Sequence, residues 1–137
     1  MNIKLEAKLC KKYPRLYADR FAPMQNTAMC WGFQCGDGWY KIIDQLSSEL
    51  EKIIVQYIKD NPYSADCYLR ASTVKEKYGT LRFYMVSETA EMSALIRKAE
   101  KQSAKTCEVC GEPGKLRGRA WYSTRCTPCW EKERKCV

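Results

Sequence analysis

Two pairs of cysteines near the C-terminus constrain what this part of the chain can fold into. The sequence reads CEVC at 107–110 and, after fifteen further residues, CTPC at 126–129. Each C-x2-C pair can wrap a tight turn around a metal ion and present two sulfur atoms to it. The spacing predicts one structural zinc ion with no open position for water or substrate. Its four ligands would be Cys107, Cys110, Cys126 and Cys129.

Turn-forming residues surround these cysteine pairs. Gly111 directly follows Cys110, where a backbone that turns past a metal often needs a positive φ angle. Pro113 and Gly114 mark a second turn. Residues 115–125 are rich in Arg, Trp and Tyr, which favours a short β-hairpin between the two pairs.

The length and composition indicate a single globular unit. A chain of 137 residues predicts one domain, or one domain with a small appendage. No uninterrupted apolar run approaches the roughly 18–20 residues of a membrane span, and residues 1–8 lack the apolar core of a signal peptide. We therefore expect a cytoplasmic protein whose nine cysteines are metal ligands or reduced thiols.

The chain contains no histidine, which excludes several catalytic centres. Nucleophiles paired with histidine, imidazole general bases and histidine–metal nuclease sites all need that side chain. A zinc deaminase with three cysteine ligands is an alternative, because Glu112 lies two residues after Cys110. Against it, Arg125 stands where the deaminase signature has proline, and Cys107 would occupy the position of the catalytic water. With nucleotide-binding glycine motifs also absent, the sequence favours a protein that is not an enzyme.

The positive charge of the chain is concentrated near its C-terminus. Residues 97–137 contain 11 Lys or Arg against 5 Asp or Glu, whereas residues 1–96 contain 13 against 11. Four thiolates and one divalent zinc ion would add a net charge of −2 to the C-terminal part. This correction weakens an inference of nucleic-acid binding from net charge alone.

Apolar periodicity predicts three helices. The clearest spans about residues 38–60, where apolar residues recur at three- and four-residue steps, with Asp37 as its expected N-cap. Shorter helices are expected at residues 3–12 and at about residues 87–105. The glycine- and aromatic-rich residues 30–39 predict a structured loop before the long helix.

The remaining pattern predicts a strand pair and sets the fold class. Residues 69–75 and 81–86 read as two strands joined by a turn at residues 77–80. We expect an α+β fold in which a small antiparallel sheet packs with two main helices and a four-cysteine zinc module follows. The helix-and-hairpin body would cover residues 1–105, and the module residues 106–137.

The order and spacing of three segments resemble a family of small, mostly uncharacterised proteins encoded by bacteriophages, prophages and bacteria. The segments are CGDGW at 35–39, VKEKYGTLRFY at 74–84, and the stretch from Ala99 through CEVCG at 107–111 to Cys126. The resemblance covers about residues 30–130 and implies a bacterial cytosol and a mobile-element setting, with no settled activity. By analogy with phage accessory proteins, we expect a protein that binds and modulates or inhibits a host protein or a protein–nucleic-acid complex, including those of defence systems.

Two basic clusters are candidate surfaces for a partner or for nucleic acid. The residues of the expected C-terminal hairpin are Lys115, Arg117, Arg119, Trp121, Tyr122 and Arg125, and those of the strand pair are Lys75, Lys77 and Arg82. Arginines can contact phosphates while aromatic rings stack on bases, so direct DNA or RNA binding is the alternative function. A less specific interpretation of the C-terminal hairpin is a solvated rim around the zinc module, with Trp121 packed beside the metal. For the strand pair, it is a hairpin whose charged edges deter pairing with other sheets.

The other cysteines allow a second, weaker metal hypothesis. Cys30 and Cys35 could form a site together with Cys10 or Cys67, although free cysteines are more often small buried apolar residues. Cys136 is expected to be a thiol near the C-terminus.

Overall fold

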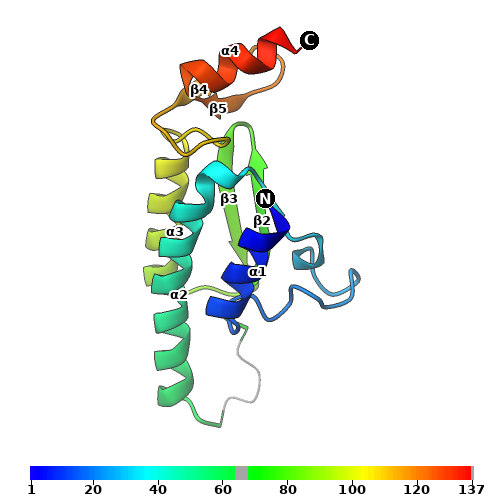
Figure 1. The fold of residues 1–137 in the computed structure, drawn as a ribbon. Coiled ribbons are helices and arrows are strands. Elements are labelled where there is room, and N and C mark those ends of the chain that lie inside the picture. Colours follow the sequence, from blue (N-terminus) through cyan, green and yellow to red (C-terminus); the bar gives the residue numbers. More distant parts are fainter. Residues whose placement is uncertain (64–67, 137) are drawn as a thin grey trace.

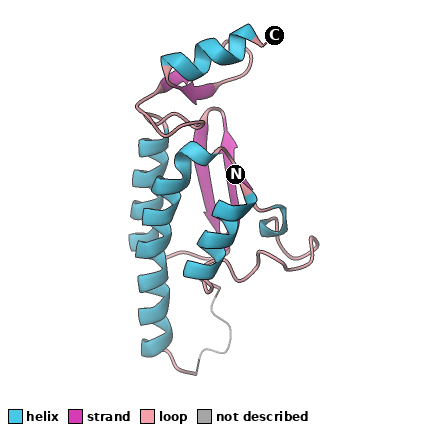
Figure 2. Cartoon of the chain, viewed as in Figure 1, coloured by secondary structure: helices cyan, strands magenta, loops and turns pink. Residues whose placement is uncertain are grey.

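The computed structural model describes residues 1–63 and 68–136, which form an α+β fold (Figure 1 and Figure 2). The helices are α1 (Ile3–Lys12), α2 (Tyr40–Asp60), α3 (Ala90–Ser103) and α4 (Thr127–Lys135), with 3-10 turns η1 (Met29–Trp31) and η2 (Asp37–Trp39). The strands are β1 (Phe33–Gln34), β2 (Ala71–Lys77), β3 (Thr80–Met85), β4 (Lys115–Arg117) and β5 (Ser123–Arg125). In the part of the chain that the structure describes, none of the helices has the length and apolarity to cross a membrane.

Helix α2 buries one face along most of its length, as its apolar periodicity predicts. The buried apolar residues of this face are Ile43, Leu46, Leu50 and Ile54. Each such side chain stabilises the fold by about 1.5–3 kcal/mol when fully buried. Helix α3 runs back beside α2 and adds Met92 and Ile96 to the core (Figure 1). It begins three residues later than expected, because the Thr89 hydroxyl accepts a hydrogen bond from the Met92 amide and caps the helix.

Strands β2 and β3 form the expected hairpin. They pair antiparallel, and their two-residue turn has positive φ angles at Tyr78 (54°) and Gly79 (83°). Positive φ at both central residues is the type I′ geometry that matches the twist of a hairpin. A bulky residue is uncommon in this region, and holding one there costs on the order of 1–3 kcal/mol.

The sheet itself is mixed, not antiparallel as expected. Strand β1 pairs parallel to β2, with Phe33 opposite Val74, and the strand order is β1-β2-β3. The two residues of β1 lie inside the segment expected to be a loop, and so short a strand has no periodicity that the sequence could reveal.

The N-terminal segment closes the core of the body. Leu9 and Leu16 are fully buried, and the rings of Tyr17 and Phe33 pack in a T-shaped arrangement with their centroids 4.9 Å apart. The N-cap role expected for Asp37 is wrong. Its carboxylate accepts a hydrogen bond from the Asn2 backbone amide at 2.6 Å, and no side chain caps η2 or α2. Asp37 therefore holds the N-terminus against the loop.

Candidate metal centre

The fold brings all four cysteines of the two C-x2-C pairs to one point. The sulfur atoms of Cys107, Cys110, Cys126 and Cys129 lie within 4.8 Å of one another, and those of Cys110 and Cys126 are 3.6 Å apart. Sulfur atoms bound tetrahedrally at about 2.3 Å from a zinc ion lie about 3.8 Å from one another. The cluster therefore has the size of a four-thiolate metal site.

The first pair forms a tight turn whose amides face the sulfur of Cys107. The Gly111 amide donates to the Cys107 carbonyl at 2.9 Å, and Gly111 has the positive φ angle (81°) that its position predicts. Burial would raise the pKa of the Cys107 thiol, but backbone amides of Cys126, Cys110 and Val109 donate to its sulfur and lower the pKa to about 6. These amides favour the thiolate, which is the form that binds metal.

The second pair lies where β5 meets α4. Cys126 is the N-cap of α4 and Cys129 lies in its first turn, so the helix places the two sulfurs on one side. The neighbouring Cys126 thiol, followed by burial, raises the pKa of Cys129 to about 12. Four thiols this close cannot all ionise without a compensating cation, and a divalent metal ion would supply that charge.

The first cysteine turn is fixed to the body by the loop at residues 35–39. The Gly36 amide donates to the Glu108 carboxylate at 2.9 Å, and the Gly38 amide donates to the Glu108 carbonyl at 2.7 Å. A Cβ atom added to Gly36 would lie 2.3 Å from the Glu108 carbonyl oxygen, and one added to Gly38 would lie 2.1 Å from that of Cys107. Glycines at these positions therefore allow two backbones to touch.

The aromatic residue that ends this loop adds a further bond. The indole Nε1 of Trp39 is buried and donates to the Thr106 carbonyl at 2.9 Å. The loop expected before the long helix thus contacts the residue that precedes the first cysteine. The repeated glycines and the tryptophan are the signal in the sequence that could have indicated this contact, which the cysteine spacing alone does not predict.

The hairpin turn of the body forms the second attachment. The buried Thr124 hydroxyl donates to the Gly79 carbonyl at 2.6 Å, and the Glu108 amide donates to the Thr124 carbonyl at 3.0 Å. A Cβ atom on Gly79 would lie 2.3 Å from the Leu116 side chain. Strand β5 is therefore in contact with both the first cysteine turn and the β2–β3 turn (Figure 1).

The strands β4 and β5 confirm the hairpin expected between the cysteine pairs, but two of its arginines have structural roles. Arg117 donates to the Arg125 carbonyl at 3.0 Å and to the Thr127 hydroxyl at 2.8 Å. The Arg125 side chain is largely buried and lies 3.6 Å from the Glu133 carboxylate. Arg117 therefore joins the hairpin to α4, whereas the buried Nε atom of Arg125 makes no hydrogen bond within the described residues.

The other basic and aromatic candidates of the hairpin are exposed. Lys115 and Arg119 are exposed, and the Trp121 side chain is 82% exposed. The interpretation in which Trp121 packs beside the metal is therefore wrong. Trp121 and Tyr122 instead lie next to the β2–β3 turn, where they line one cleft with Lys77 and Tyr78.

The second basic cluster lies on one face of the sheet. Lys75 pairs directly with Arg82 across β2 and β3, and Lys77 follows two residues later on the same face. The opposite face carries Leu81 and Phe83, which are buried in the core. The structure therefore keeps these three cations together and near the cleft.

The remaining cysteines form no second site in the described residues, where one cysteine cluster is found. Cys35 is buried in the apolar core, and this burial raises its pKa to about 12. Cys10 and Cys30 are partly buried free thiols, and Cys136 is exposed at the end of α4. Cys67 lies outside the described residues.

Comparisons with protein-family models, with curated proteins and with solved structures each found no match to this chain. The resemblance to phage and prophage proteins therefore stays a prediction.

Proposed function

We propose that this chain is a non-enzymatic binding protein in which a structural zinc ion fixes a surface for a macromolecular partner. The observation that carries the proposal is the closed donor set, whose four sulfur atoms lie within 4.8 Å of one another. Four thiolates fill the tetrahedral coordination of zinc, so a zinc ion held there has no position for a reacting water or substrate. Its contribution is to the folding of the C-terminal module.

The surface that this module completes is a cleft of about 310 Å³, which we call the aromatic cleft. Its lining residues are Glu76, Lys77 and Tyr78 from the body and Ala120, Trp121 and Tyr122 from the β4–β5 loop. Because the two sides come from different parts of the chain, the cleft depends on the attachment that the metal site stabilises. Tryptophan and tyrosine are enriched among the residues that dominate binding energy at interfaces.

The setting we propose is the cytoplasm of a bacterial cell, where a phage or prophage protein would bind a host protein or a protein–nucleic-acid complex. The resemblance of the 35–39 and 74–84 segments supports this setting. A reducing cytoplasm would keep the four ligand thiols free to bind metal.

A capture experiment tests the proposed function. Tagged full-length protein would be cross-linked in bacterial cells, and its partners compared between wild type, Trp121→Ala and Trp31→Ala. Trp31 is the matched control, because it is also largely exposed (62%) but belongs to η1, away from the cleft residues. We expect Trp121→Ala and zinc chelation to remove the partners, and Trp31→Ala to retain them. Partners that persist after both Trp121→Ala and chelation would contradict the proposal.

A further inference from the structure

We infer that the aromatic cleft and the adjoining sheet face bind single-stranded nucleic acid. This inference rests on the proposed function and names the partner class for the same surface. This surface differs from the hairpin expected from the sequence, because Arg117 is engaged in structural hydrogen bonds and the Arg125 side chain is largely buried beside Glu133. The cations that remain available to contact phosphates belong mainly to strands β2 and β3 of the body.

The first observation is a group of cations without neutralising partners, which we call the cationic strand face. It consists of Lys75, Lys77 and Arg82 on the outer face of β2 and β3. Within residues 1–63 and 68–136, no carboxylate forms an ion pair with any of the three. Like charges placed directly opposite each other destabilise a strand pair, as Lys75 and Arg82 are here. A bound polyanion would remove that repulsion.

The donor capacity of Arg82 is only partly used. Its Nη1 atom donates to the Thr80 hydroxyl at 2.6 Å and to the Leu81 carbonyl at 3.0 Å, which orients the guanidinium along the strand. The other guanidinium nitrogens have no hydrogen-bond partner among the described residues. An oriented guanidinium with free donors suits a phosphate oxygen.

The second observation is the placement of aromatic rings at both ends of this face. Tyr84 is exposed on β3, opposite Thr73. It lies four residues from Thr80, the end of β3 that adjoins the cleft, which is about 13 Å along the strand. At the cleft, Tyr78 and Trp121 are 71% and 82% exposed. Rings on either side of a row of cations form the arrangement in which bases stack while phosphates contact the charges.

Tyr78 gives an independent reason to assign binding to this position. The turn places it at a φ angle of 54°, where asparagine, aspartate or glycine would be less strained. The chain nevertheless presents a tyrosine ring there, with the Lys77 ammonium 5.6 Å from the ring centroid. A strained residue that stays exposed in a cleft indicates a binding role, because packing does not require its side chain.

These features favour a single strand over a duplex. In a duplex the base faces are stacked on one another, so the exposed rings of Tyr78 and Trp121 would have no base to contact.

The cleft also contains one carboxylate, that of Glu76. It accepts a hydrogen bond from the Gly79 amide at 2.6 Å, and this bond directs the carboxylate toward the β2–β3 turn.

The test uses the full-length, zinc-loaded protein and fluorescent oligo(dT), oligo(U) and mixed-sequence duplexes of about 15 nucleotides, within the site sizes of single-strand-binding folds. Fluorescence anisotropy should show tighter binding of the single strands than of the duplex. Trp121→Ala should weaken single-strand binding by about 5- to 150-fold, the effect of removing one base–aromatic stack. Lys75→Glu should weaken it as well, and should reduce the slope of log affinity against log salt by about 0.7 for each phosphate that the variant no longer neutralises.

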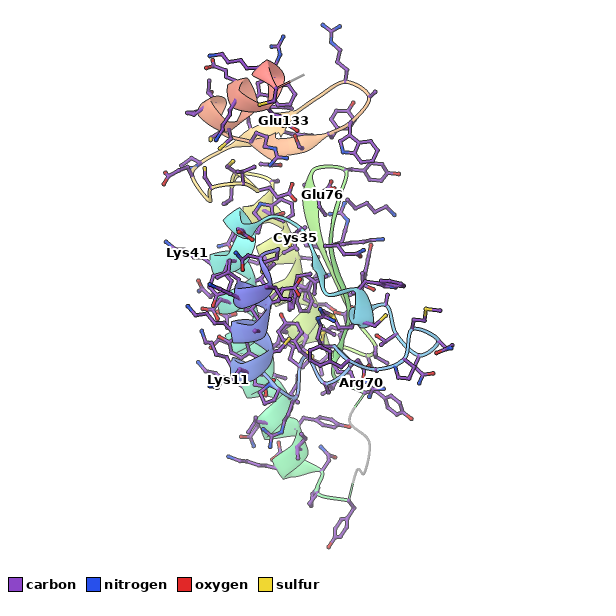
Figure 3. All side chains as sticks on the ribbon, turned by 45° about the vertical axis from the view of Figure 1, so that its right-hand side comes forward. Lys11, Cys35, Lys41, Arg70, Glu76 and Glu133 are labelled. Atoms are coloured by element: carbon purple, nitrogen blue, oxygen red, sulfur yellow. The ribbon has the colours of Figure 1, made fainter. Side chains whose placement is uncertain are left out.

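Matched variants separate binding from folding. Lys75→Glu places a carboxylate opposite Arg82, so its thermal stability should equal or exceed that of the wild type. Lys41→Glu is the charge control, since Lys41 lies on the helical side of the molecule, away from the β2–β3 end marked by Glu76 (Figure 3). This control should bind the single strands as the wild type does.

Three results would overturn the inference. They are equal affinity for duplex and single strand, equal effects of Lys75→Glu and Lys41→Glu, and displacement of oligo(dT) by polyglutamate at the same charge concentration. If one of these occurs while Trp121→Ala still abolishes capture of cellular partners, the cleft binds protein and the proposed function stands. If capture is also unaffected by Trp121→Ala and by chelation, both proposals fail.

Discussion

At the scale of single residues, Gly38 marks the closest approach of the body to the C-terminal module. We expect Gly38→Ala to lower the free energy of unfolding by about 1–3 kcal/mol, because the added Cβ would lie 2.1 Å from the Cys107 carbonyl oxygen. Backbone atoms cannot move aside as a flexible side chain can. The variant should also bind zinc less tightly, since the clash displaces the first cysteine turn.

Chemical denaturation and zinc competition with a chromophoric chelator would measure both effects. Gln34→Ala is the control, because Gln34 is an exposed residue of the neighbouring strand β1. A Gly38→Ala variant with the stability and zinc affinity of the control would show that the 35–39 loop does not hold the module.

At the scale of elements, Asp44 attaches α1 to α2. Its carboxylate accepts hydrogen bonds from the Lys12 ammonium at 2.6 Å and from the Tyr13 hydroxyl at 2.7 Å. Partial burial would raise the pKa of Asp44, but these hydrogen bonds outweigh burial and lower the pKa below its usual 3.8. A carboxyl group with a lowered pKa stabilises the folded state above its unfolded pKa, and this contribution disappears as the pH falls through the folded pKa.

We therefore expect Asp44→Asn to lower the free energy of unfolding at neutral pH by less than about 1 kcal/mol, since the Lys12 pair is partly exposed. The difference between variant and wild type should shrink as the pH falls below 3.8. Urea denaturation across this pH range measures it, with Glu49→Gln on the same helix as the control. A difference that stays constant with pH would assign the effect to packing and not to charge.

At the scale of the whole molecule, the metal site and the apolar core are separate. The core of the body contains residues from Leu9 to Ala99, and none of the four clustered cysteines belongs to it. Structural zinc contributes its binding free energy to the folding of the part that holds it. We expect chelation to speed hydrogen exchange at the amides of Gly38 and Glu108, which join body and module, while the Leu50 region of α2 stays protected.

Elemental analysis should find about one zinc per chain, with loss in Cys110→Ser and retention in Cys136→Ser, an exposed cysteine outside the cluster. A single cooperative loss of all helical signal on mild chelation would show that the body cannot fold without the metal. Full zinc content in a variant that lacks both Cys107 and Cys126 would exclude the proposed ligand set.

Features that depend on local spacing could be predicted from the sequence. The periodicity of residues 38–60 predicted α2, and the fifteen residues between the cysteine pairs predicted both the cluster and the β4–β5 hairpin. Such patterns can be read locally, because a helix face repeats every 3.6 residues and a C-x2-C turn is complete within four residues.

Which surfaces meet depends on how the elements pack together. The tertiary structure paired β1 parallel to β2, placed Gly38 against the first cysteine turn, and brought Trp121 beside Tyr78. It also showed that Arg117 and Arg125 are structural, whereas Lys75 and Arg82 are available on an open face. The first three arrangements join residues about 40 to 70 positions apart, and no local pattern encodes such contacts. The contacts of Arg117 and Arg125 are closer in sequence, but they depend on how the hairpin packs against α4.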